Sequence, residues 1–197
     1  MARTRRGLDY FDPQFHLPAV KLLPGDFVAT HADSLLVTVL GSCVAACLRD
    51  PVVGVCGMNH FMLPQSSSVT TSDSLSARFG VQAMELLITE MQKRGARRDR
   101  LQAKVFGAGK VLDGMNVVNV GELNADFVRR YLDLERIPII ASDLLGDSAR
   151  KVYFFTDSGK VMIRRLNTAK VAKLVLRERQ YRERIAGADW QGGIDLF

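Results

Sequence analysis

Apolar positions in this chain fall into two kinds of pattern, and together they predict a mixed α/β protein. Short apolar runs bounded by Gly, Pro, Asp or Ser are typical of strands, whereas apolar residues spaced three and four apart are typical of amphipathic helices. Strands are expected at 34–40, 101–106, 137–142, 151–155 and 160–165, and helices at 79–95, from 121 onwards and at 171–185. The prediction is an α/β (α+β) fold whose β-sheets are built largely from hairpins with helices packed outside, a single-domain sandwich.

Three regions are distinguished along the chain. Residues 1–26 form an N-terminal extension, of which 1–20 are expected to be irregular; residues 27–166 form the main domain, and 167–197 form a basic C-terminal helix and flexible tail. A Ser/Thr-rich stretch at 64–74 is expected to be a loop, either a solvated linker or a mobile lip. The Gly-rich segment 107–110 lacks the spacing of the phosphate-binding motifs and is expected to be a tight turn beside the site described next.

The most informative segment is a predicted hairpin that carries a cysteine and a histidine. Apolar runs flank Asp50 and Pro51, which are favoured at the first positions of a β-turn. If the chain reverses directly after Pro51, Cys43 lies opposite His60 and Cys47 lies opposite Cys56. Residues that face each other across antiparallel strands have Cβ atoms about 4.5–5.5 Å apart. A thiol and an imidazole at that separation form a cysteine nucleophile with its general base.

Two other interpretations of these residues are open. Both side chains could simply belong to the core, where free cysteine is common, and this is the interpretation favoured for Cys47 and Cys56. Alternatively, Cys43, Cys47, Cys56 and His60 have a spacing similar to that of four-ligand zinc sites. Strand geometry disfavours zinc, because Cys43 and Cys47 would lie about 13 Å apart along one strand. No metal is therefore expected.

Composition and charge narrow the choice of partners. The 197 residues are 47% hydrophobic and 24% charged, as in ordinary globular proteins, and the net charge of +6 favours acidic partners. Between Lys170 and Arg184 there are six basic and two acidic residues, but the chain has no nucleic-acid recognition motif. The longest apolar run, 35–48, is too short to cross a bilayer. Three cysteines without a secretory signal indicate the cytoplasm.

Several sequence motifs together resemble those of the CheD family of chemoreceptor glutamine deamidases. The similarity covers roughly residues 27–166 and rests on LGSCV at 40–44, RDP at 49–51, GMNHFMLP at 57–64, AKVFGAG at 103–109, GMN at 114–116, and DLLG at 143–146 with Arg150. The resemblance implies a cysteine deamidase-like sandwich that hydrolyses particular receptor glutamines to glutamate, without a cofactor.

The resemblance also implies roles for individual residues. Cys43 matches the nucleophile and His60 the base, and the backbone near Gly41 and Ser42 is the expected source of oxyanion donors. The third family residue is a threonine six positions before the cysteine, where this chain has Val37; Thr38 follows it. Neighbours on a strand point to opposite faces, so either the backbone bulges here or Thr38 is structural and another group orients His60.

The resemblance implies partners and leaves two other functions open. The expected partners are the cytoplasmic helices of chemotaxis receptors and, in some members, a CheC-type phosphatase; nucleic acid and membrane insertion are not expected. The same nucleophile would also serve a receptor methyl-ester hydrolase, and the chain could instead be a non-catalytic adaptor that binds the phosphatase. The basic C-terminal helix either docks on an acidic partner or is a solvated helix packed by Leu174, Leu176 and Ile185.

Overall fold

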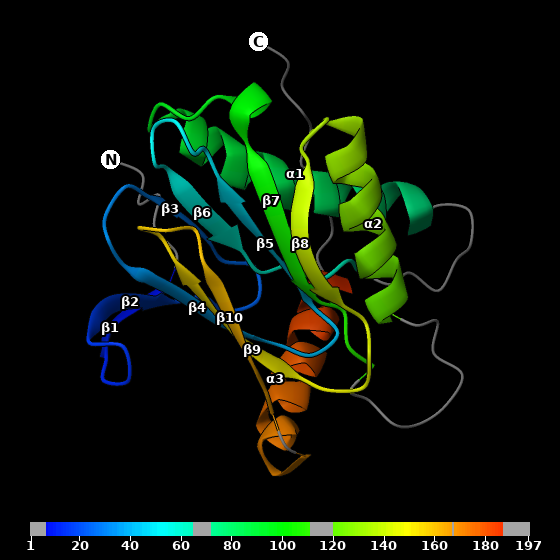
Figure 1. Ribbon diagram of the computed structural model, residues 1–197. Coiled ribbons are helices and arrows are strands. Elements are labelled where there is room, and N and C mark those ends of the chain that lie inside the picture. The colour runs from blue at the N-terminus through cyan, green and yellow to red at the C-terminus, as the bar shows by residue number, and fades with distance from the viewer. Residues whose placement is uncertain (1–6, 65–71, 111–119, 167, 187–197) are drawn as a thin grey trace.

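Two β-sheets packed face to face form the centre of the protein (Figure 1). The computed structural model describes residues 7–64, 72–110, 120–166 and 168–186. The first sheet has the order β1 (Leu8–Asp12), β2 (Leu17–Lys21), β4 (Leu35–Leu40), β9 (Arg150–Phe155) and β10 (Val161–Arg165). The second has the order β3 (Phe27–Thr30), β6 (Cys56–Asn59), β5 (Val44–Arg49), β7 (Gln102–Gly107) and β8 (Ile139–Leu144). The predicted mixed α/β sandwich is confirmed.

Helices cover the outside of the second sheet and one end of the sandwich. The long helices α1 (Ser72–Gln92) and α2 (Val120–Leu134) pack on the outer face of the second sheet, and a short 3₁₀ helix, η1 (Arg98–Arg100), precedes β7. The helix α3 (Thr168–Ala186) lies across the end of the sandwich where the chain passes from β4 to β5. In this position α3 covers the loop that carries Cys43.

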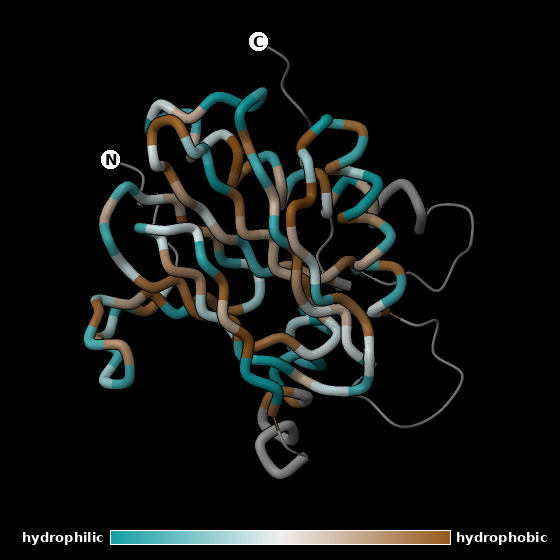
Figure 2. Tube along the Cα trace, viewed as in Figure 1, coloured by the Kyte–Doolittle hydropathy of each residue, from teal (hydrophilic) through white to brown (hydrophobic). Residues whose placement is uncertain are grey.

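The buried apolar side chains form two main clusters, one on each face of the second sheet. One cluster joins α1 and α2 to this sheet, and the other fills the space between the two sheets and continues to α3 through Tyr181 and Ile185. Hydrophobic and hydrophilic residues both occur along the strands and the helices (Figure 2), and the central strands β4 and β5 are almost entirely apolar and buried. Cys43 belongs to the cluster between the sheets, so its thiol lies inside the core.

The expectation that residues 1–20 are irregular is wrong for β1 and β2. These strands form a hairpin whose inner strand, β2, pairs in parallel with β4. Leu8 and Phe11 on β1 are largely exposed, and Pro18 interrupts the run on β2, so neither strand has the apolar pattern of a buried one. The pairing of β2 with β4 stabilises this hairpin.

The strand β3 is also not expected from the sequence, and α1 starts at Ser72 rather than at residue 79. Residues 65–71 of the predicted loop lie outside the described residues.

The hairpin forms, but its register differs from the prediction by two residues. Val44 pairs with Phe61, Cys47 with Met58 and Arg49 with Cys56, so Cys43 does not lie directly opposite His60, nor Cys47 opposite Cys56. The cause is a longer turn. The amide of Asp50 donates to the carbonyl of Val55, and the turn closes through Gly54, whose φ of 72° suits glycine. Because side chains alternate with a period of two, the displacement leaves Cys43 and His60 on the same face.

Candidate active site

The loop between β4 and β5 holds Cys43 in a fixed backbone conformation. The carbonyl of Cys43 accepts a 2.7 Å hydrogen bond from the amide of Ala108, and the carbonyl of Gly41 accepts a 2.6 Å bond from the amide of Gly109. The side-chain amide of Asn124 on α2 donates to the carbonyl of Ser42 at 2.8 Å. With its carbonyls bound on one side, the loop directs its N–H groups to the other, towards α3. The Gly-rich segment after β7 lies beside the site, as expected.

His60 follows β6 and is held by both its backbone and its ring. Its amide donates to the carbonyl of Asp26 at 2.9 Å, and its carbonyl accepts from the amide of Gly25 at 2.7 Å. The ring atom Nδ1 lies 2.7 Å from the hydroxyl of Thr38, and that hydroxyl donates to the carbonyl of Leu22 at 3.0 Å. Because the single hydroxyl proton is directed at Leu22, Nδ1–H must be the donor to Thr38. This tautomer leaves Nε2 with its lone pair.

The alternation of side chains along β4 decides which of Val37 and Thr38 faces the imidazole of His60. Val37 packs in a separate cluster with Leu35 and Tyr153, on the face away from the second sheet. Thr38 is fully buried on the inner face, next to His60. Thr38 therefore contacts the imidazole, although it stands one position away from the threonine that the resemblance implies.

Cys43, His60 and a residue that the sequence did not predict, Glu178, meet at one point. The Cys43 sulfur, a ring nitrogen of His60 and a carboxylate oxygen of Glu178 all lie within 4.8 Å of one another, and all three residues are buried. Among the described residues, Nε2 of His60 has no hydrogen-bond partner. Since Nδ1 is bound to Thr38, Nε2 is the nitrogen free to accept a proton from Cys43.

Burial sets the protonation states of the pair. It lowers the pKa of His60 from its ordinary value of 6.5 to about 3, so the imidazole is neutral near pH 7. Burial also raises the pKa of the Cys43 thiol well above its ordinary value, and the adjacent carboxylate of Glu178 raises it further. The pair in this structure is consequently a neutral thiol beside a neutral imidazole.

Glu178 reaches the site from α3 and binds the N–H groups of the cysteine loop. Its Oε1 accepts from the amide of Gly41 at 2.7 Å and from that of Cys43 at 3.4 Å. Its Oε2 accepts from the amide of Ser42 at 2.9 Å and from the hydroxyl of Ser42 at 2.7 Å. Glu178 is 1% exposed, so its charge is stabilised by these donors rather than by solvent. Three consecutive backbone amides thus form an anion-binding cradle next to Cys43.

A sequence signal for Glu178 exists, although it is a weak one. The buried side chains of α3 include Leu174, Tyr181 and Ile185, and Glu178 lies on the same helical face. A lone carboxylate within an apolar stripe is unusual, because buried charges need partners. The expected packing of α3 is confirmed for Leu174 and Ile185 but is wrong for Leu176, which is 56% exposed.

The same three side chains are those that could hold a metal ion. Sulfur, imidazole nitrogen and carboxylate oxygen together would suit zinc, but the carboxylate is already bound by the loop amides. Cys47 and Cys56 are not part of this group, so the structure brings together only two of the four residues of the zinc alternative. All three cysteines are free and buried. Cys47 and Cys56 belong to the core between the sheets, as predicted.

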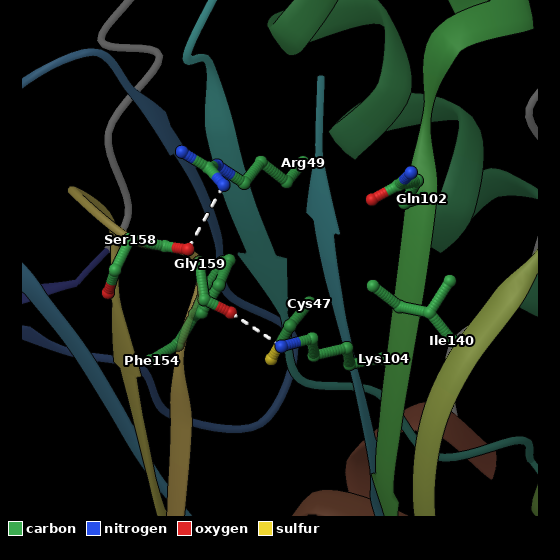
Figure 3. Close-up of a pocket in the computed structure, with 8 residues that line it drawn as sticks. All are labelled: Cys47, Arg49, Gln102, Lys104, Ile140, Phe154, Ser158 and Gly159. Atoms are coloured by element: carbon green, nitrogen blue, oxygen red, sulfur yellow. Dashed lines mark hydrogen bonds between the residues drawn. The ribbon is translucent and has the colours of Figure 1, made fainter. Parts of the chain in front are cut away.

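A separate small pocket lies on the far side of the second sheet from α1, between β5, β7 and the β9–β10 turn (Figure 3). Its two cations, Arg49 and Lys104, donate to the carbonyls of Ser158 and Gly159 at 3.0 and 2.8 Å. These hydrogen bonds connect the β9–β10 turn to the second sheet. Cys47 lines the pocket without a histidine beside it, so this pocket does not reproduce the arrangement around Cys43.

The fold and the site define a mixed α/β protein with a buried cysteine–histidine pair. The family described as "CheD chemotactic sensory transduction" matches residues 62–165. A "Probable chemoreceptor glutamine deamidase CheD 2" of Chromobacterium violaceum is 57% identical over 192 residues, covering 95% of this chain and 94% of that protein. A "Probable chemoreceptor glutamine deamidase CheD 1" of Shewanella oneidensis is 51% identical over 190 residues, covering 95% and 92%. The chain therefore belongs to the CheD family.

A solved structure with partial similarity is that of the Bacillus licheniformis hypothetical protein YfiH. It matches with a TM-score of 0.40 and 15% identity, over 61% of this chain and 51% of that one. In the part of the chain that the structure describes, no helix is both long enough and apolar enough to cross a membrane.

Proposed function

We propose that this protein hydrolyses the side-chain amides of glutamine residues in the cytoplasmic helices of chemotaxis receptors, producing glutamate and ammonia. One observation carries the proposal: the Cys43 sulfur lies beside a histidine whose other nitrogen is fixed by Thr38. The curated relatives, named as probable chemoreceptor glutamine deamidases, support the choice of substrate.

The reaction begins with proton transfer from Cys43 to Nε2 of His60. The resulting thiolate attacks the amide carbon of the glutamine and forms a tetrahedral intermediate with a negatively charged oxygen. The amides of Gly41, Ser42 and Cys43 are suited to bind that oxygen, since they already bind a carboxylate. In measured enzymes, removal of one such preorganised donor lowers kcat by about 10²- to 10³-fold.

Protonated His60 then donates its proton to the departing amine, and ammonia leaves as the C–N bond breaks. The substrate is now a thioester on Cys43. Water, deprotonated by Nε2 of the same imidazole, attacks the thioester carbon and releases glutamate and the thiol. Thr38 acts through His60 as a positioning residue, because it keeps the proton of the neutral ring on Nδ1.

The test is incubation of the full chain with a receptor cytoplasmic fragment, followed by measurement of ammonia and mass spectrometry of receptor glutamines. Conversion of glutamine to glutamate is expected with the wild-type chain and not with Cys43→Ser or His60→Gln. Cys56→Ser is the matched control, because Cys56 is a buried thiol outside the site whose sulfur donates to the carbonyl of Thr156. Full activity of Cys43→Ser would contradict the proposal.

The same experiment addresses the alternative activities. Methanol release from a methylated receptor fragment without ammonia release would favour the methyl-ester hydrolase. Binding of a CheC-type phosphatase remains a prediction from the family resemblance; a pull-down with Cys43→Ala tests it. Receptor-dependent function that survives Cys43→Ala in cells would favour the adaptor.

A further inference from the structure

The helix α3 closes the site that a substrate has to enter. Its buried residues Leu174, Tyr181 and Ile185 pack on the core between the sheets, and Glu178 reaches the cradle from the same helical face. The ring of Tyr181 lies so close to Gly25 that a side chain at Gly25 would come within 3.1 Å of the tyrosine oxygen. Gly25 donates to the carbonyl of His60, so α3 packs directly on the segment that holds the base.

The group that α3 presents to Cys43 has the chemistry of the reaction product. Glutamate is what deamidation of glutamine leaves behind. In this structure a glutamate side chain on a helix is bound by the amides of Gly41 and Ser42, with its carboxylate next to the Cys43 sulfur. A receptor glutamine must place its amide carbon in the same position to be attacked, and the receptor segment that carries it is also a helix.

We propose that α3 occupies the binding site of the substrate helix and that Glu178 stands where the product glutamate stands, so that the chain blocks its own active site. This inference rests on the proposed deamidase function. It makes release of α3 a required step before a receptor helix binds. It also means that a glutamine at position 178 is presented to Cys43 as an intramolecular substrate.

The alternative role for Glu178 is that of a third catalytic group, and the contacts disfavour it. A carboxylate that assists His60 would bind Nδ1, but Nδ1 is bound to Thr38. Glu178 instead occupies the donors that the oxyanion needs. A negative charge at this place also opposes formation of the thiolate, as the raised pKa of Cys43 indicates.

The decisive experiment uses the full chain with Glu178→Gln. If α3 lies in the substrate position, Cys43 attacks the new amide, ammonia leaves, and water converts the thioester to glutamate at position 178. Mass spectrometry of the peptide that contains residue 178 should therefore find glutamate instead of the encoded glutamine. The double variant Cys43→Ser, Glu178→Gln should retain glutamine. Gln180 is exposed on the same helix and is an internal control that should stay unmodified in both.

Receptor assays run in parallel separate this inference from the proposed function. If the wild-type chain deamidates the receptor fragment while the glutamine introduced at position 178 stays intact, the assignment of α3 to the substrate site is overturned and the proposed function stands. If the glutamine introduced at position 178 is converted to glutamate while every receptor glutamine stays intact, the assignment of α3 to the substrate site stands. The proposal that chemotaxis receptors are the substrate is then wrong. If neither is converted, both fail.

Two further measurements do not depend on how well the glutamine variant folds. Adding the receptor fragment to the Cys43→Ser chain should increase hydrogen exchange in α3, because the two helices compete for one site; unchanged protection of α3 in the complex would contradict the proposal. Glu178→Ala should increase ammonia release from the receptor fragment several-fold, and alkylation of Cys43 by iodoacetamide should also become faster. The matched control is Glu183→Ala, an exposed glutamate on the same helix. Loss of receptor deamidation in Glu178→Ala alone would instead make Glu178 a catalytic residue.

Discussion

The hydroxyl of Thr38 lies 2.7 Å from Nδ1 of His60 and donates its own proton to the carbonyl of Leu22. The first contact links β4 of the first sheet to the residue that follows β6 of the second, and the second contact binds Thr38 to the residue that follows β2. They also fix which ring nitrogen carries the proton, and thereby direct the lone pair of Nε2 into the site.

Replacing Thr38 by Val should lower kcat while leaving the fold intact. The substitution keeps the shape of the side chain and removes the acceptor for Nδ1–H, so the population of the productive tautomer falls. We expect a loss of at least tenfold, below the ~10⁴-fold seen when a charged tautomer-fixing partner is removed. Thr38→Ser restores a hydroxyl and should recover most of the activity. Equal loss in both variants, measured as ammonia release at saturating substrate, would indicate that only packing matters.

A second prediction concerns the pH dependence of the free energy of unfolding that the buried imidazole of His60 causes. The pKa of His60 is lowered to about 3 in the folded protein, against 6.5 ordinarily, so between these values the unfolded chain binds a proton that the folded chain does not. The free energy of unfolding should therefore decrease as pH falls from 6.5 towards 3, with a contribution of up to about 1.4 kcal/mol per pH unit.

Urea unfolding across that pH range checks this expectation. His60→Gln should remove this contribution and flatten the profile. Identical slopes for the wild type and His60→Gln would mean that His60 is not buried as a neutral ring.

The sequence predicted the hairpin and its two chemical groups because both depend on local pattern. Asp50 and Pro51 mark the turn, and the period of two keeps Cys43 and His60 on one face even though the turn is longer than expected. The exact register depends on the bonds of Asp50 and on Gly54, which the turn residues alone do not specify.

Two other contacts depend on tertiary structure and could not be read from local pattern. Thr38 meets His60 only because the two sheets pack face to face, which no spacing within β4 encodes. Glu178 lies 137 positions from Gly41, and its place in the cradle depends on how the C-terminal helix crosses the end of the sandwich. The strands β1 and β2 are not predicted because both are short, because β1 is an edge strand with exposed apolar side chains, and because Pro18 interrupts the apolar run of β2.

Gly107 should be one of the most sensitive backbone positions of the site. Its φ is 112°, and a Cβ there would lie 2.2 Å from the carbonyl oxygen of Cys43. Gly107→Ala must therefore displace the cysteine loop, and a misplacement of about 1 Å can cost about 10²-fold in rate. Gly95 also has a positive φ, 91°, but a Cβ there meets nothing within 4 Å. Gly95→Ala should cost only the backbone strain, about 1–2 kcal/mol, and retain activity. Similar activity of the two folded variants would contradict this account.

Asn124 offers a test of how the cysteine loop is held from the opposite side. Its side-chain amide donates to the carbonyl of Ser42 at 2.8 Å, while its oxygen accepts from the amide of Leu63 at 2.8 Å. The residue is fully buried, so Asn124→Ala leaves two buried backbone groups without partners. Each unsatisfied group costs about 1–3 kcal/mol, and we expect a loss of about 2–5 kcal/mol in the free energy of unfolding in urea.

The same substitution should also lower activity at temperatures where the variant is folded, because the Ser42 peptide is then free to rotate away from the cradle. Asp126→Ala is the matched control on α2, since the Asp126 side chain is 70% exposed and its contact with Arg129 is 3.8 Å long. It should change stability by less than about 0.5 kcal/mol. If Asn124→Ala lost stability but kept full kcat, the Ser42 carbonyl bond would stabilise the fold without orienting the loop amides. Loss of both stability and kcat would show that Asn124 holds the cysteine loop in place.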